Sequence, residues 1–394
     1  MRRLRDRDDG AVAVLVALLA VVLLGLAAFV TDLGLAYSRQ RQLQTAADGA
    51  ALAAAKSFSS VAGPVTSCSA VLSGGAAAAI SAAVRFERLN APPGTSLATG
   101  AAPAGWNGDA GVAYRCNAAR NIEVQVTNAG ASPTFFGALL GASDYDLGTR
   151  ATAVMGAARS ITGLRPFALC SAVVDVLMAA AAADPTQNQL VSINKVFNSS
   201  YPAGVDTSCG TASGNWGTLD FDGGNNNAGA ATLWTDIGYN EPVDLGGDLQ
   251  ISFPGDPGFP SPNSGNCSTA DGCINSGTNL GDALNNILGR PVPLPVFREV
   301  SGSGGNATYV VTGFLGVTIC GWKVGNSSGT VPTLGGTPCF TPTPALPTGG
   351  GSNDNAFQVR VERFTPIGEI SDVCGLDAAP QCIQTTLRVL QLVE

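Results

Sequence analysis

The most regular hydrophobic pattern in the chain is an uncharged apolar run close to the N-terminus. Residues 11–31 read AVAVLVALLAVVLLGLAAFVT and contain no charged side chain. As an α-helix this run is about 31 Å long, which matches the ~30 Å hydrocarbon core of a bilayer. The apolar core of an export signal is usually only about 7–15 residues long. The length therefore favours an uncleaved transmembrane helix, while the small residues around Ala27 and Ala36 leave a cleaved export signal as the alternative.

The helical pattern continues beyond the apolar run, because the first proline is Pro64 and residues 32–56 are mostly strong helix formers. A stripe at spacings of three and four runs from Leu26 through Tyr37 and Gln44 into small residues. Rows of small residues let helices approach closely. Two interpretations stay open: the helix packs on its own domain, which we favour slightly, or it is a stalk that bundles with copies of itself or with partners. The alanines that form these rows are Ala46, Ala47, Ala50, Ala51, Ala54 and Ala55.

Beyond residue 60 the pattern mixes short helices with alternating strands. Helical spacing covers residues 76–89, 173–183 and 279–288, and Ser132-Pro133 is typical of a helix start. Segments rich in valine, isoleucine and aromatic residues predict strands at 121–127, 150–155, 190–197, 249–253, 309–322 and 357–364. The pattern predicts an α+β fold, in which a long N-terminal transmembrane and stalk helix precedes an extracytoplasmic mixed α/β region with antiparallel strands and disulfides.

These boundaries predict five segments. We expect a cytoplasmic leader at 1–10, a transmembrane helix at 11–31, a stalk helix at 32–60, an α+β domain at 61–158 and a disulfide-braced accessory domain rich in Gly, Pro and Asn at 159–394. Four arginines precede the apolar run and two follow it closely. The positive-inside rule therefore places the N-terminus in the cytoplasm and the bulk of the chain outside.

The composition removes most catalytic chemistry. The chain has no histidine, which excludes Ser-His-Asp and Cys-His sites, and it has no GxxxxGK[ST] string to cradle nucleotide phosphates. The formal net charge of −8 argues against nucleic acid as a partner, because phosphate binding needs a basic surface. We expect neither an enzyme nor a bound cofactor. A hydrolase that uses carboxylates alone is the remaining enzymatic alternative, and no carboxylate spacing suggests it.

All ten cysteines follow residue 60, on the side of the apolar run that we expect to face an oxidising compartment. Their order along the chain suggests five structural disulfides: Cys68–Cys116, Cys170–Cys209, Cys267–Cys273, Cys320–Cys339 and Cys374–Cys382. The spacings match no zinc template. The weak calcium candidates are Asp220, Asp222 and Asn225, where the glycine register departs from the EF-hand pattern and a solvated turn is the default interpretation.

Two stretches of the sequence resemble one known family. The first combines Gly10 and the apolar run with Asp32-Leu33-Gly34, Tyr37, Arg41-Gln42-Leu43-Gln44 and the string AADGAALA at 46–53. The second combines Ile122-Glu123-Val124-Gln125-Val126, Pro133-Thr134-Phe135-Phe136-Gly137 and Arg150-Ala151-Thr152-Ala153-Val154. Over about residues 8–155 the chain resembles the TadE/TadG-like family of Flp (Tad) pilus-assembly proteins. Leu15 stands where pilins carry glutamate after the cleavage-site glycine, and no DxSxS motif is present, so neither pilin processing nor a von Willebrand A metal site is expected.

The resemblance implies a non-enzymatic, membrane-anchored envelope component that presents an extracytoplasmic domain for protein–protein assembly. The expected partners are the membrane and other pilus or envelope proteins, with self-association through the stalk helix included. The expected location is the cell membrane, crossed once, with the N-terminus in the cytoplasm. The alternative is a secreted or surface-exposed binding module, similar to an adhesin, whose N-terminal export signal is cleaved.

Overall fold

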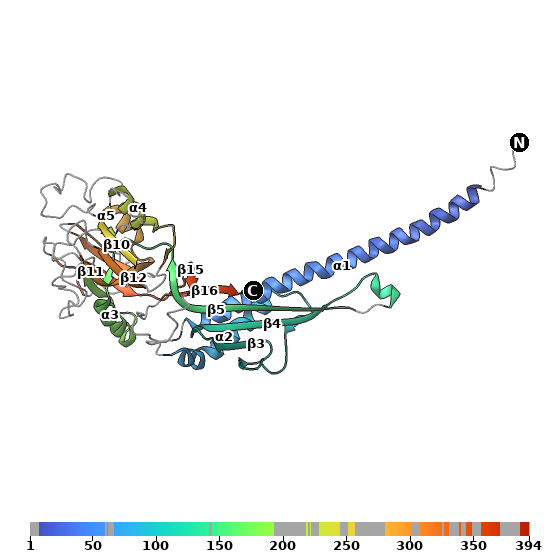
Figure 1. The fold of residues 1–394 in the computed structure, drawn as a ribbon, viewed down its shortest axis with the longest axis horizontal. Coiled ribbons are helices and arrows are strands. Elements are labelled where there is room, and N and C mark those ends of the chain that lie inside the picture. The colour runs from blue at the N-terminus through green and yellow to red at the C-terminus, as the bar shows by residue number, and fades with distance from the viewer. Residues whose placement is uncertain are drawn as a thin grey trace.

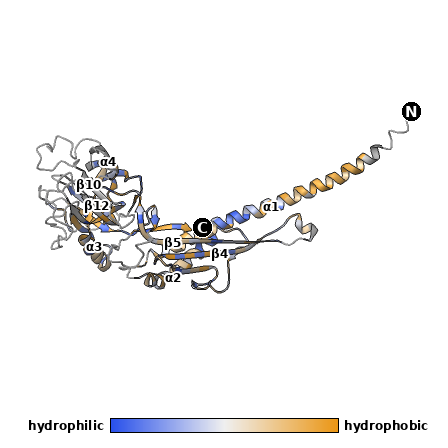
Figure 2. Cartoon of the chain, in the orientation of Figure 1, coloured by the Kyte–Doolittle hydropathy of each residue, from blue (hydrophilic) through white to orange (hydrophobic). Residues whose placement is uncertain are grey.

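The computed structural model describes residues 8–59, 61, 67–141, 144–192, 218–219, 221, 228–244, 251–256, 280–301, 308–324, 327–330, 339, 344–348, 356–370 and 387–393. Its longest element is α1 (Asp8–Phe58), a single helix that projects far beyond the strands and the other helices (Figure 1). The N-terminal half of α1 is apolar and exposed on all sides, and its hydropathy changes before the helix reaches the sheet (Figure 2). The structure therefore confirms the long N-terminal apolar helix that the sequence predicts.

The second half of α1 is the centre of a helix–sheet body and not a free stalk. The body contains α2 (Cys68–Asn90) and an antiparallel sheet whose strands are β1 (Thr95–Leu97), β2 (Asn107–Gly108), β3 (Val112–Cys116), β4 (Ile122–Ser132) and β5 (Tyr145–Ile161). In β4, Ile122, Val124 and Val126 are buried and alternate with less buried polar residues, so one face of the sheet packs on the helices. Asp32, at 3% exposed, is the first buried residue of this half of α1.

The six alanines of α1 lie inside this body. Each of them is 0% exposed, and all except Ala46 pack in one cluster with Ala79 and Ala83 of α2 and with the valines of β4. Small side chains let α1 approach both α2 and the sheet closely, which larger residues would prevent. The structure thus has the helix packed on its own domain. The earlier part of the predicted stripe, Leu26 to Tyr37, stays exposed because it precedes the body.

The C-terminal strand returns to this first sheet. Strand β16 (Arg388–Val393) pairs antiparallel with β5, from Arg388 opposite Ala157 to Val393 opposite Thr152. The chain between β5 and β16 is therefore an insertion between two paired strands of the first sheet, and β16 completes the helix–sheet body. Strands β9 (Val243–Asp244) and β15 (Gly368–Ile370) also pair with the distal end of β5.

The inserted region forms a second sheet with its own helices. Its strands are β6 (Leu169–Cys170), β7 (Gln189–Ser192), β8 (Thr218–Leu219), β10 (Ile251–Asp256), β11 (Pro291–Ser301), β12 (Thr308–Val324), β13 (Ser327–Thr330) and β14 (Ala356–Val361). The helices are α3 (Ser171–Ala183), α4 (Ala228–Ile237) and α5 (Leu280–Ile287). Aromatic packing supports the core, with the rings of Phe167 and Phe357 at 5.0 Å in an edge-to-face arrangement.

Strand β11 escaped the sequence prediction because it contains Pro291, Pro293 and Pro295. Proline lacks the N–H that a central strand needs. Here the three prolines alternate, so they share one edge of β11, and the carbonyl of Pro293 on that edge accepts from the N–H of Arg165. Because the prolines alternate, the backbone N–H groups of the residues between them lie on the opposite edge of β11 and can pair with β12. The expected helix start at Ser132-Pro133 is also corrected: those residues end β4 and enter a loop, and a short 3-10 helix, η1 (Gly137–Leu140), follows.

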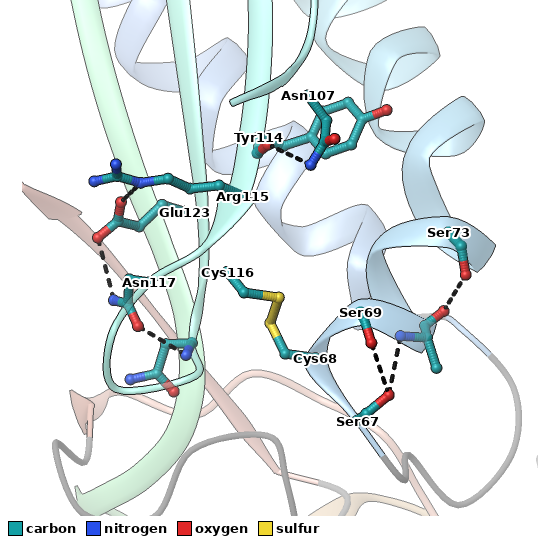
Figure 3. Close-up of a disulfide and its surroundings, with 12 residues drawn as sticks. Ser67, Cys68, Ser69, Ser73, Asn107, Tyr114, Arg115, Cys116, Asn117 and Glu123 are labelled. Carbon is teal, nitrogen blue, oxygen red and sulfur yellow. Dashed lines mark hydrogen bonds and ion pairs between the residues drawn. A yellow bond between two sulfur atoms is a disulfide. The ribbon is translucent and has the colours of Figure 1, made fainter. Parts of the chain in front are cut away.

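Two of the suggested disulfides lie within the described residues. Cys68 bonds to Cys116 and ties the start of α2 to the end of β3 (Figure 3). Cys320 bonds to Cys339 in the inserted region. Cys170 is also disulfide-bonded, but its suggested partner Cys209 lies outside the described residues, as do Cys267, Cys273, Cys374 and Cys382.

Replacing Cys68 and Cys116 together by serine will destabilise the helix–sheet body. The loop that this disulfide closes spans 48 positions, against 19 for the other bond, and chain entropy predicts losses of about 4 and about 3 kcal/mol respectively. Guanidinium unfolding of the full chain in detergent, followed by circular dichroism, measures both. The matched control is the Cys320→Ser/Cys339→Ser pair. An unchanged unfolding midpoint in the Cys68→Ser/Cys116→Ser variant would contradict this role.

An Ala50→Leu substitution tests the close packing of α1. Ala50 is fully buried, so the added atoms overpack the body and should cost about 1–3 kcal/mol of unfolding free energy. Ala53→Leu is the control, because Ala53 faces a shallow apolar groove that Ala78, Ala82 and Phe86 also line. Thermal unfolding in detergent compares the two. Equal stability of both variants would show that the α1 contacts are looser than described.

Candidate functional site

The site that joins the apolar helix to the rest of the molecule centres on Asp32. This is the first charged residue after the apolar run, and it is only 3% exposed. Its carboxylate accepts hydrogen bonds from the backbone N–H groups of Phe135 at 2.8 Å, Phe136 at 3.0 Å and Gly137 at 2.7 Å. The three donors lie in the loop between β4 and β5, where η1 begins. We call these four residues the helix–hairpin junction.

The junction has the chemistry of a helix cap supplied from a distant part of the chain. The first N–H groups of a helical turn have no partner within the helix, and a carboxylate satisfies them well. Desolvation by burial raises the pKa of Asp32, but the hydrogen bonds from Gly137, Phe135 and Phe136 together outweigh it and hold the pKa below its usual value. Asp32 is therefore ionised at neutral pH, and its negative charge fixes the loop to the helix.

Two glutamines extend the same attachment along the hairpin. The side-chain amide of Gln40 donates to the carbonyl of Gly148 at 2.8 Å, and that of Gln44 donates to the carbonyl of Arg150 at 3.2 Å. Both carbonyls lie on β5 beyond the point where β16 stops pairing at Thr152. An unpaired strand edge exposes backbone groups that need partners. The helix supplies those partners, so α1 covers the edge of β5 that the described strands leave open.

The hairpin carries an exposed aromatic pair at this level. Phe135 is 72% exposed and Phe136 is 44% exposed, although their backbone is fixed to Asp32. Figure 1 shows the β4–β5 hairpin extending along α1 toward its N-terminal half, with η1 at the tip. The exposed aromatic side chains thus lie where the apolar part of the helix ends.

The site residues suggested by the sequence have different outcomes. Asp220, Asp222 and Asn225 lie outside the described residues, so the calcium candidate is not placed. Within the described ranges, no group of three or more cysteine, aspartate or glutamate side chains is arranged to hold a metal ion. The six alanines are core residues of the helix–sheet body.

Sequence reasoning did not assign a role to Asp32. A signal was present, because Asp32, Ala36, Gln40, Leu43 and Ala47 follow one another at spacings of three and four and all face the body or the hairpin. A carboxylate on the buried face of a helix needs a donor. The pattern therefore indicated a partner for Asp32, but not that the partner lies more than 100 positions away.

These features define a class of protein: an α+β body built on the C-terminal half of one long helix, whose N-terminal half is apolar enough to anchor it in a membrane. Residues 10–57 match the family model described as "Putative Flp pilus-assembly TadE/G-like". The matched residues lie entirely within α1, and they include Asp32, Gln40, Gln44 and the buried alanines. No curated protein and no solved structure matches the chain.

The junction should open when the carboxylate is removed or protonated. In an Asp32→Asn variant, the backbone amides of 135–137 should exchange with solvent roughly 2- to 30-fold faster, the range expected for loss of a helix cap. The folded pKa of Asp32 is lowered, so its contribution is present above the unfolded value near 4 and is lost as the pH falls through the folded pKa. The wild-type chain should therefore approach the variant at acidic pH. Hydrogen exchange with mass spectrometry, corrected for the intrinsic pH dependence, measures both effects.

Asp109→Asn is the matched control for this experiment. Asp109 also accepts two backbone N–H bonds, from Gly111 and Val112 at 2.8 Å each, but in the turn between β2 and β3. Its replacement should leave exchange at 135–137 unchanged. Equal exchange of the hairpin tip in all three chains would show that Asp32 does not hold it.

Proposed function

We propose that the chain is a single-pass membrane component of a pilus-assembly system, which holds its α+β body on the extracytoplasmic side for contacts with other envelope proteins. The observation that carries the proposal is that α1 is both the apolar anchor and the core of the body. The match of residues 10–57 to the TadE/G-like family model supports the pilus-assembly context.

The continuity of α1 has a mechanical consequence. No proline interrupts the helix, and the glutamines and Asp32 fix the β4–β5 hairpin to it directly after the apolar run. The body therefore has a fixed height and orientation above the membrane. A flexible linker would let a domain search a large volume, whereas this arrangement suits a part that must meet neighbours in a defined geometry.

The orientation rests on charge and redox chemistry. The arginine-rich leader favours a cytoplasmic N-terminus. The disulfides Cys68–Cys116 and Cys320–Cys339 are typical of an oxidising compartment, which agrees with an extracytoplasmic body. Helix α2 also has the length and hydropathy to cross a membrane. We assign it to the body, because Cys68 ties it to β3 and one of its faces packs against α1.

The fold also directs where partners bind. The six alanines of α1 are buried by contacts within the chain. We therefore propose that assembly contacts form on the outer surfaces of the body and of the insertion between β5 and β16. We propose that this insertion is the accessory domain and that the remainder, closed by β16, is the TadE/TadG-like domain. We propose no catalytic activity and no cofactor for either part.

Membrane fractionation with protease treatment of spheroplasts tests the proposal. The wild-type chain should resist extraction by alkaline carbonate, be released by detergent, and have its body digested from outside. A Leu19→Arg/Val22→Arg variant should leave the membrane fraction, because each arginine at the centre of a span costs about 2.5–3.5 kcal/mol. Leu19→Ala/Val22→Ala is the matched control and should stay in the membrane.

The mature N-terminus separates the anchored protein from the secreted alternative. An intact mass that includes residues 11–31 supports the anchor. Cleavage after Ala27 or Ala36 would replace it by a secreted module, and a body found in the soluble cytosol would contradict both.

A further inference from the structure

We propose that the tip of the β4–β5 hairpin is a second membrane contact, in which Phe135 and Phe136 insert into the interface of the outer leaflet beside α1. This inference rests on the proposed function, since it takes residues 11–31 as the span. Its occupant is lipid at the boundary between headgroups and acyl chains.

The height of the tip supports the inference. Asp32 follows the uncharged run directly, so it lies within about one helical rise, 1.5 Å, of the end of the span. The N–H groups of Phe135, Phe136 and Gly137 are bonded to its carboxylate at 2.7–3.0 Å. The backbone of the aromatic pair is therefore fixed at the level where the hydrocarbon core ends, and it cannot move away without breaking these bonds.

The exposure of the pair supports a lipid occupant. Phe135 has more than two thirds of its surface exposed, and nothing in the described part of the chain covers it. On α1, Phe29 is 57% exposed and Leu33 is 49% exposed, and both lie within one helical turn of Asp32. The exposed apolar side chains of the tip are therefore at the same level as the last exposed apolar side chains of the anchor. Apolar side chains on an amphipathic element beside the bilayer enter the headgroup–acyl boundary by about 5–10 Å.

The shape of the hairpin supports the same occupant. Pairing with β3 ends at Val126, pairing with β1 ends at Gly130, and β16 leaves β5 at Thr152. Beyond those points β4 and β5 continue as a two-stranded ribbon that keeps to the side of α1 (Figure 1). Asp146 of β5, and Asp144 just before that strand, are exposed and charged. The hairpin therefore changes from apolar at Phe135 and Phe136 to charged within a few residues of its tip, as α1 does at Asp32.

Tryptophan quenching by brominated lipid tests the insertion. The full-length Phe135→Trp variant is reconstituted into phosphatidylcholine vesicles with bromines near the headgroup end of the acyl chains. Its additional fluorescence should be quenched about twofold or more, as expected for an aromatic residue at the membrane interface. Ile367→Trp is the matched control, because Ile367 is even more exposed, at 81%, but precedes β15 at the far end of β5; its fluorescence should not be quenched. Phe136→Trp gives a second reading if the first variant folds poorly.

Three further variants separate the possible outcomes. Leu19→Trp reports on the span itself: if it is not quenched, the proposed anchor fails together with the inference. If Leu19→Trp is quenched while both tip variants behave like Ile367→Trp, only the second membrane contact is wrong.

Adding Asp32→Ala to Phe135→Trp should reduce the quenching of the introduced tryptophan, whereas adding Asp109→Asn should not. Quenching that disappears at 1 M salt would also overturn the inference, because apolar insertion does not depend on charge. A tip that stays unquenched and binds a protein partner would do the same.

Discussion

The structure depends on one helix, α1, whose first half is apolar and exposed and whose second half is packed into the body. Through residues 12–31, α1 is apolar all round, as lipid requires. From Asp32 onward one face of the same helix is buried, and the small side chains on that face form part of the core of the body. Because the helix is continuous, the packing of Ala47, Ala50 and Ala54 against α2 and the sheet also sets how the body is held relative to the apolar half of α1. Stability of the body and its placement are thus produced by the same residues.

The carboxylate of Asp32 marks the boundary between the two halves of α1. Asp32 is buried against the hairpin, and an unpaired charge there would be costly. The chain satisfies it with three backbone donors from the hairpin tip, and it satisfies the open edge of β5 with Gln40 and Gln44. The helix and the hairpin therefore satisfy each other's hydrogen-bonding groups. These mutual hydrogen bonds hold the hairpin in place where it extends beyond the rest of the sheet.

Much of the fold could be predicted from local pattern. The absence of charge identified the apolar helix, alternation identified β4, and richness in valine, isoleucine and aromatic residues identified β12. Order along the chain suggested the pairs Cys68–Cys116 and Cys320–Cys339. Two features were missed because the deciding contact is distant in sequence. The return of β16 to β5 and the partners of Asp32 depend on such contacts. Strand β11 failed for a different reason, since its prolines are tolerated only because they all face one edge.

In the proposed arrangement, α1 passes from the membrane into the body as one unbroken, rigid helix. Residue-resolved hydrogen exchange of the full chain in phosphatidylcholine nanodiscs measures this continuity. We expect continuous protection of the backbone amides from residue 12 to residue 58, without a gap around Asp32. A stretch of rapid exchange between residues 31 and 43 would show a hinge at the membrane surface and would rule out a rigid connection.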